Sequence, residues 1–313
     1  MSSTKPCPLN LDWTLVLETR KIAVLITRIA AATGAAILVT SCSPTTTTLP
    51  PNHSGTNAMF EHVHELVPDP SDGTLLVATH EGIYRLTIAA DGTAAADGPI
   101  GGFDFDPMGF TLADGVTYAS GHPGPTTPDT FGSPNLGLIT STDLGMSWTN
   151  VSLTGETDFH GLAVANPDGA DPRVFGYDES RQRVVTSLDG GASWIDGAQL
   201  AARDILADGE MLYATTAEGL AVSSDNGRTF VVLNGVPTLY VIAADPTGAM
   251  AGIDTTGRLW TRAPEAEWIP GLTVQGTPQA FAVDGDRLYV ADDRGIAYTE
   301  DAGATWTLLQ LAE

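Results

Sequence analysis

The sequence has little cysteine and little positive charge. Its 313 residues include two cysteines, Cys7 and Cys42, and neither has a second cysteine at metal-binding spacing, so a disulfide framework and a cysteine-based zinc site are excluded. Lysine and arginine total 14 against 38 aspartates and glutamates, which gives a net charge of −24. Because nucleic-acid binding depends on basic side chains that contact phosphates, this composition excludes a nucleic-acid partner.

Amphipathic helical patterns are also missing after residue 58. Strand-like runs alternate there with turn residues, and the whole chain is rich in glycine (34 residues) and proline (20 residues). This composition is typical of short strands joined by tight turns, and it argues against coiled coils and helical repeats. Apolar residues make up 42% of the chain, a share typical of folded domains. We therefore expect an all-β domain over residues 59–313.

The first 58 residues have the pattern of an export signal followed by a tether. Basic residues at positions 20, 21 and 28 precede the apolar run IAAATGAAILVTS, which is too short for a membrane-spanning helix. The segment Val39-Thr40-Ser41-Cys42 resembles the bacterial lipobox, whose cysteine becomes the lipidated N-terminus of the mature protein. We expect a signal peptide over 1–41, a lipid on Cys42, a Thr/Pro-rich tether over 42–58, and attachment to the extracytoplasmic face of a bacterial membrane. An ordinary secretory signal with a chance cysteine is the alternative.

An eight-residue turn recurs four times in the second part of the chain, at 141–148, 187–194, 223–230 and 299–306. Its pattern is Ser/Thr-x-Asp-x-Gly-x-Ser/Thr-aromatic. The aspartate side chain can accept hydrogen bonds from turn amides, the glycine adopts positive φ without steric cost, and the aromatic residue begins a returning strand. The residues at these three positions are Asp143, Gly145 and Trp148; Asp189, Gly191 and Trp194; Asp225, Gly227 and Phe230; and Asp301, Gly303 and Trp306.

The repeated turn resembles the Asp-box, or bacterial neuraminidase repeat, of sialidases and related β-propellers. In that family the box joins the third and fourth strands of a blade and has a structural role. Aligning outward from the four turns gives six units of about 42 residues, a normal length for a propeller blade. The resemblance thus implies one six-bladed β-propeller over residues 59–313, and we expect it to be a monomer. The segment 123–135 is long enough to cap one mouth of the channel.

Propellers place function at the mouth of the central channel, on their innermost strands. The alignment puts one residue of each inner strand at the same level, which gives a first layer of six residues. Because side chains two residues apart in a strand share a face, the residues two positions earlier form a second layer. The first layer is His64, Met108, His160, Arg203, Tyr240 and Gln279, and the second is His62, Asp106, Asp158, Ala201, Thr238 and Thr277. The histidines outside the tether all lie in the first three units, at His62, His64, His80, His122 and His160.

Three interpretations of these histidines stay open. They can simply hydrogen-bond to one another and to the aspartates, or serve acid–base work in a substrate pocket, or bind a metal ion. The metal hypothesis assigns the ligands to His62, His64, Met108, His122 and His160. It favours copper over zinc because a thioether suits copper, with Asp106 and Asp158 orienting the imidazoles.

Sialidase activity is not expected. Sialidases of this fold hold the substrate carboxylate with three arginines, whereas Arg203 alone falls in the predicted channel layer of this chain. The segments His62-Val-His64, Gly121-His122-Pro123 and Asp158-Phe-His160 are similar to a group of exported, sialidase-like, glycosylhydrolase-like bacterial lipoproteins. A different glycoside hydrolase, acting on a small ligand or glycan, is the alternative function because the chain offers carboxylates near the channel. The candidate catalytic residues are then Asp106, Asp158 and Arg203, and Glu65 and Asp204 could supply a further carboxylate pair.

Overall fold

Short β-strands make up almost all the regular structure of residues 60, 62–166 and 171–312, the part of the chain that the computed structural model describes. Two single-turn 3-10 helices, Ile100–Gly102 (η1) and Asp129–Phe131 (η2), complete it. None of the described helices is long and apolar enough to cross a membrane. The predicted signal peptide, the lipid site at Cys42 and the tether lie outside the described residues.

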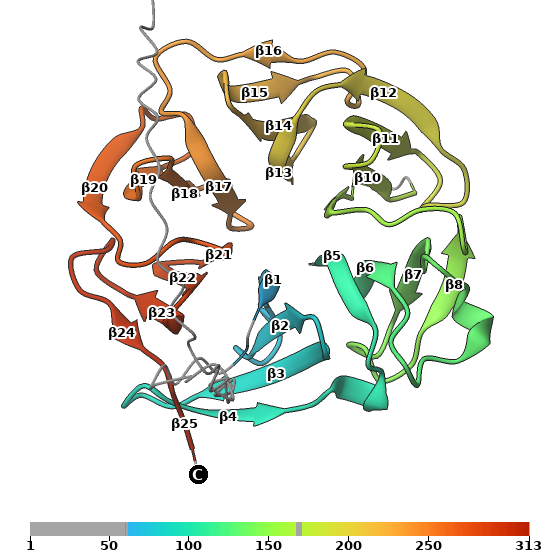
Figure 1. Cartoon of the computed structure of the whole chain (residues 1–313). Helices are drawn as coiled ribbons and strands as arrows, with labels where there is room; N and C mark the ends of the chain where they lie inside the picture. Colours follow the sequence, from blue (N-terminus) through green and yellow to red (C-terminus); the bar gives the residue numbers. More distant parts are fainter. Residues whose placement is uncertain (1–59, 61, 167–170, 313) are drawn as a thin grey trace, which may run out of the picture. The chain divides into compact units, whose positions relative to one another are not determined.

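The strands form six antiparallel sheets, here called blades 1 to 6 in chain order, which surround a central channel (Figure 1). Each blade has an inner, a second, a third and an outer strand. Blades 1 to 3 consist of β1 (Val63–Pro68), β2 (Leu75–Thr79), β3 (Gly82–Ile88) and β4 (Thr93–Asp97); β5 (Asp106–Ala113), β6 (Val116–His122), β7 (Leu138–Ser141) and β8 (Thr149–Ser152); and β9 (Gly161–Ala165), β10 (Arg173–Asp178), β11 (Arg183–Ser187) and β12 (Ile195–Gln199). Blades 4 to 6 consist of β13 (Ala202–Asp208), β14 (Met211–Thr216), β15 (Gly219–Ser223) and β16 (Val231–Val232); β17 (Leu239–Ala244), β18 (Met250–Asp254), β19 (Arg258–Arg262) and β20 (Ile269–Thr273); and β21 (Ala280–Asp284), β22 (Arg287–Asp292), β23 (Gly295–Thr299) and β24 (Thr307–Leu308).

The ring of blades is closed by the C-terminal end of the chain. The last strand, β25 (Gln310–Leu311), pairs in parallel with β4, so blade 1 has a fifth strand that comes from the other end of the domain. Each inner strand contacts the inner strands of both neighbouring blades, including β1 with β21. The predicted all-β, six-bladed propeller is therefore confirmed.

The repeated turns join the third and fourth strands of their blades, and their hydrogen bonds follow one pattern. In the first turn, Asp143 Oδ1 accepts hydrogen bonds from Ser141 Oγ at 2.7 Å and from the Ser147 amide at 2.9 Å. Asp143 Oδ2 accepts from Ser147 Oγ at 2.6 Å, and the Gly145 amide donates to Ser141 Oγ at 2.8 Å. The same four bonds recur in the turns that contain Asp189, Asp225 and Asp301. Bonds from the hydroxyls and amides of each turn lower the pKa of its aspartate to about 2.

The aromatic residue that ends each turn packs toward the preceding blade. Trp194 of blade 3 donates from Nε1 to Ser152 Oγ on β8 at 2.9 Å. The adjacent Gly191 has a φ of 97°, and a Cβ there would meet Leu138 Cδ2 at 2.1 Å. The turns thus fasten neighbouring blades to each other, which explains why they recur around the ring.

The segment 123–135 is held on the outer part of blade 2. Asn150 on β8 donates from Nδ2 to the Thr130 carbonyl at 2.5 Å. Phe131, in η2, is buried in an apolar cluster and packs edge-on against Phe103, with ring centroids 5.8 Å apart. These contacts hold the segment against blade 2.

Candidate metal centre at the channel mouth

One end of the channel, called the mouth below, is where the inner strands begin. Because strands within a blade are antiparallel, the second strands end at the same mouth. In blade 2 this pairing places Asp106, the first residue of β5, opposite His122, the last residue of β6. In blade 1, His62 and His80 each lie one residue beyond the last strand pair, Val63 with Thr79. The mouth therefore collects side chains from two strands of each blade.

Four of the six inner strands carry a β-bulge near this mouth. Register shifts mark it in blades 1, 2, 4 and 5, where the extra residues are His64, Met108, Arg203 and Tyr240. In blades 3 and 6 the amides of His160 and Gln279 donate to second-strand carbonyls just before the regular pairing starts. These six residues occupy equivalent places, and they are the residues of the first predicted layer.

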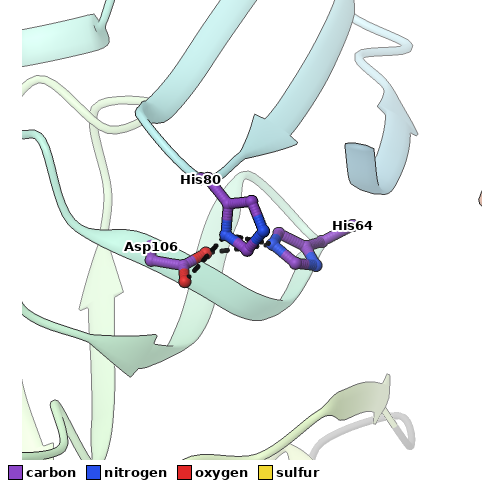
Figure 2. Close-up of side chains that lie close together, drawn as sticks. All are labelled: His64, His80 and Asp106. Carbon is purple, nitrogen blue, oxygen red and sulfur yellow. Dashed lines mark hydrogen bonds and ion pairs between the residues drawn. The ribbon is translucent and has the colours of Figure 1, made fainter. Parts of the chain in front are cut away.

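Two imidazoles and one carboxylate converge between blades 1 and 2 (Figure 2). His64 Nε2 lies 3.0 Å from Asp106 Oδ1 and 3.2 Å from His80 Nδ1, which in turn lies 2.9 Å from Asp106 Oδ2. The ligand atoms of the three residues all lie within 4.8 Å of one another. Two ligands bound at 2.0–2.1 Å to a tetrahedral zinc ion would lie roughly 3.3 Å apart. The observed distances are slightly shorter than this, so small outward shifts would admit an ion.

The electrostatic state of the group also fits a cation. Burial alone would raise the pKa of Asp106, but the neighbouring imidazoles of His64 and His80 outweigh burial and lower it, so the carboxylate stays ionised. Burial, followed by the neighbouring imidazoles of His64 and His80, lowers the pKa of His62 and favours its neutral ring. Asp106 Oδ1 is buried and accepts no well-directed hydrogen bond from the described residues. A metal ion between the three groups would satisfy this oxygen.

A second carboxylate continues the cluster into blade 3. Asp158 Oδ2 lies 3.1 Å from His122 Nε2 and 3.0 Å from His160 Nε2. His160 Nδ1 lies 2.5 Å from Glu179, which follows β10. His122 Nδ1 is also 3.9 Å from Asp106 Oδ2, so the imidazole of His122 separates the two carboxylates. Asp158 thus orients two histidines beside the first group.

Comparison with known proteins finds similar folds but no related sequence. No protein-family model and no curated protein sequence matches the chain. A chain of the nidogen/laminin complex is similar with a TM-score of 0.56 and 18% identity, over 76% of this chain and 93% of that one. A gluconolactonase from Xanthomonas campestris has a TM-score of 0.54 and 12% identity, over 76% and 86%. PorZ, a surface component of the type-IX secretion system of Porphyromonas gingivalis, has a TM-score of 0.50 and 13% identity, over 83% and 39%.

This chain is a six-bladed β-propeller. Below 25% identity such likenesses show the architecture alone, since one fold hosts many functions. Function has to be argued from the residues of the mouth and the channel.

The converging group differs from the predicted ligand set. Among the imidazoles and carboxylates it keeps His64 and adds His80 and Asp106. His62 stacks on His80 with ring centroids 4.9 Å apart, whereas His122 and His160 gather around Asp158. The sequence places His80 among the histidines of the first three units but does not mark it as a ligand. Its position directly after a second strand, matching that of His122, was the available signal.

The candidate catalytic residues do not form one group. Asp106 and Asp158 both lie among imidazoles, while Arg203 donates to the Gln279 carbonyl at 3.0 Å and lies over the Tyr240 ring at 5.0 Å. Arg203 lines a cavity of about 300 Å³ inside the channel, together with Glu65 and Asp204. Burial and the nearby Asp204 raise the pKa of Glu65 well above its ordinary value. Burial also raises the pKa of Asp204, to about 6, although the Ile242 amide and Arg203 oppose this.

Proposed function

We propose that this chain is a metal-binding β-propeller that holds one divalent transition-metal ion at the mouth of its channel. The observation that carries the proposal is the convergence of His64, His80 and Asp106 within 4.8 Å. Imidazole nitrogen and carboxylate oxygen are common ligands of zinc and copper(II). Three protein ligands leave a coordination position for water or a substrate, where a bound ion would act as a Lewis acid.

The identity of the ion follows from the donor set. The expectation of copper rested on the thioether of Met108, which favours copper(I). Two imidazoles and a carboxylate favour divalent ions instead, so we propose zinc as the resident metal. Copper(II) should bind the purified protein at least as tightly, because it precedes zinc in the general order of affinities. The net charge of −24 would raise the local concentration of either cation.

The proposal places this domain outside the cytoplasm. The lipobox-like segment before Cys42 supports a lipid anchor on the extracytoplasmic face of a bacterial membrane, with the propeller acting as a monomer. The shared hydrogen-bond pattern of the four turns supports a relation to the Asp-box propellers.

Calorimetric titration of zinc into the chelator-treated protein tests the metal site. We expect one site of micromolar or tighter affinity, and a loss of at least about 100-fold in His64→Ala and in His80→Ala. His160→Ala is the matched control, because it removes an imidazole of the same mouth that lies outside the converging group. Equal affinities in all four proteins, or a loss confined to His160→Ala, would show that the site is not where we place it.

A glycoside hydrolase without sialidase specificity is the second candidate. The candidate catalytic carboxylates Asp106 and Asp158 lie among imidazoles, an environment that suits metal binding better than proton donation. The observation in its favour is Asp204, whose pKa of about 6 is close to that required of a general acid at neutral pH. A panel of fluorogenic glycosides, with a sialoside included, distinguishes the candidates. Hydrolysis that Asp204→Asn abolishes would favour the enzyme, and no turnover of the sialoside is expected.

A further inference from the structure

The channel below the mouth contains a cavity of about 300 Å³, whose lining includes one residue of the proposed metal site, His64. Inner strands of all six blades line it, so it lies on the axis of the ring. Its volume is at the low end of the range for small-molecule pockets, about 300–1,000 Å³. One ligand of roughly the size of a sugar ring would fill it.

Two acidic residues on the inner strands of opposite blades line the cavity. Glu65 of β1 and Asp204 of β13 occupy the same position, directly after the bulge, in blades 1 and 4. These two blades face each other across the ring (Figure 1). The residues next after the bulge in the other four blades are Gly109, Gly161, Val241 and Ala280. The carboxyl pair is thus a specific feature of two blades and not of the repeat.

The two carboxyls are only partly satisfied by the protein. Asp204 Oδ2 accepts a hydrogen bond from the Ile242 amide at 2.9 Å. The Glu65 carboxyl accepts none from the described residues, and it lines the cavity. Glu65 is half-buried, so its carboxyl oxygens can accept hydrogen bonds from a ligand or from water in the cavity.

Hydrogen-bond donors lie one residue before the position of the carboxyls, in the layer of the bulge residues. Arg203 uses one guanidinium nitrogen on the Gln279 carbonyl, at 3.0 Å, and lines the cavity beside Asp204. Gln279 accepts the Val63 amide on its side-chain oxygen at 3.0 Å, so its amide nitrogen is left as a donor. Deeper in the channel the lining becomes apolar, with Leu66, Phe110, Leu162, Ile205, Ile242 and Phe281.

We propose that this cavity binds a neutral polyhydroxylated molecule of about one sugar ring. Its hydroxyls would donate to Glu65 and Asp204 and accept from Arg203 and Gln279. The guanidinium disfavours a simple cation, and the two carboxyls disfavour an anion, whereas hydroxyl groups can both donate and accept. The apolar residues below would contact the C–H faces of such a ring. The pocket does not need the metal ion proposed above, and it is compatible with either candidate function.

Calorimetry or saturation-transfer NMR at pH 7 tests the proposal with five probes. Three are neutral (D-glucose, D-galactose and myo-inositol), D-glucosamine is cationic and D-glucuronate is anionic. Each is measured with a chelator present and again with zinc bound. We expect millimolar or tighter binding of at least one neutral probe under both conditions, and at least about tenfold weaker binding of its charged analogue.

Variants connect the binding to the cavity. Asp204→Asn and Arg203→Met should each weaken binding of the neutral probe by about tenfold or more, since each removes a charged hydrogen-bond partner. Asp97→Asn is the matched control, because Asp97 is exposed on β4, far from the channel axis. The near-ultraviolet circular dichroism of each variant verifies that it is folded.

Several outcomes would overturn the proposal. They are no binding of any neutral probe, tighter binding of a charged one, or unchanged binding in both channel variants. Binding that requires zinc would move the ligand to the metal at the mouth and would also refute the pocket. The zinc titration of the same samples is read separately, so failure of the pocket and failure of the metal site are distinguishable.

Discussion

Replacing Asp204 with asparagine should stabilise the propeller at neutral pH. Asp204 lines the channel cavity together with Glu65 and Arg203, and burial raises its pKa from 3.8 to about 6. The folded state therefore holds the proton of Asp204 more tightly than the unfolded state does. Stability from this proton is fully present below about pH 4 and is lost as the pH rises through about 6.

The expected magnitude follows from the shift. One pKa unit corresponds to about 1.4 kcal/mol, so a rise from 3.8 to about 6 amounts to about 3 kcal/mol at pH 7. Glu65 shares the same region, and charge removed from Asp204 also relieves Glu65, so the two carboxyls titrate as a pair. Asparagine keeps an oxygen that can accept the Ile242 amide, so this hydrogen bond is not lost. We expect Asp204→Asn to exceed the wild type by about 1–3 kcal/mol at pH 7 and to match it near pH 4.

Urea unfolding followed by tryptophan fluorescence measures the difference. Both proteins are unfolded at several pH values from 4 to 8, at constant ionic strength and with a chelator present. Asp97→Asn removes the same charge from an exposed strand, and its difference from the wild type should stay within about 0.5 kcal/mol at every pH. A stabilisation by Asp204→Asn that does not change with pH, or a loss of stability at pH 7, would refute the reasoning.

Two further predictions concern the repeated turns and the N-terminal segment. Asp189→Ala removes the acceptor of three hydrogen bonds in the turn of blade 3, so the melting temperature should fall. Zinc affinity should not change, because these turns lie at the opposite end of the blades from the mouth; a weakened zinc isotherm would contradict this. Since the pKa of Asp189 is lowered to about 2, calorimetric scans should show the stabilisation present above about pH 4 and lost as the pH falls through about 2. Cys42→Ser should move the protein from the membrane fraction to the soluble fraction in a bacterial host, and protein that stays in the membrane would disprove the lipid anchor.

Much of the fold could be predicted because its signals are local. The aspartate and glycine of each repeated turn act within eight residues, as the bonds around Asp143 show. Once the turns are aligned, the alternation of side chains along each inner strand fixes which residues are equivalent. His64 and Met108 could therefore be assigned to equivalent positions. Blade 5 has a turn at the equivalent place, residues 261–268, that lacks the aspartate and the glycine but ends in Trp268. The turn still forms, with Glu265 at a φ of 55°.

The site needed the tertiary structure because its residues come from different blades. The sequence showed that histidines gather in blades 1 to 3, but the separations among their side chains depend on how neighbouring blades tilt and pack. That packing brought His80 to His64 and Asp106. The dependence on tertiary structure is greater for Glu65 and Asp204. They belong to opposite blades and line the same cavity only when the ring is closed. Closure depends on β25 pairing with β4, a contact between the two ends of the domain that no local pattern encodes. Turn chemistry and strand period are properties of a few consecutive residues and can be read from the sequence, whereas the contents of the channel depend on all six blades at once.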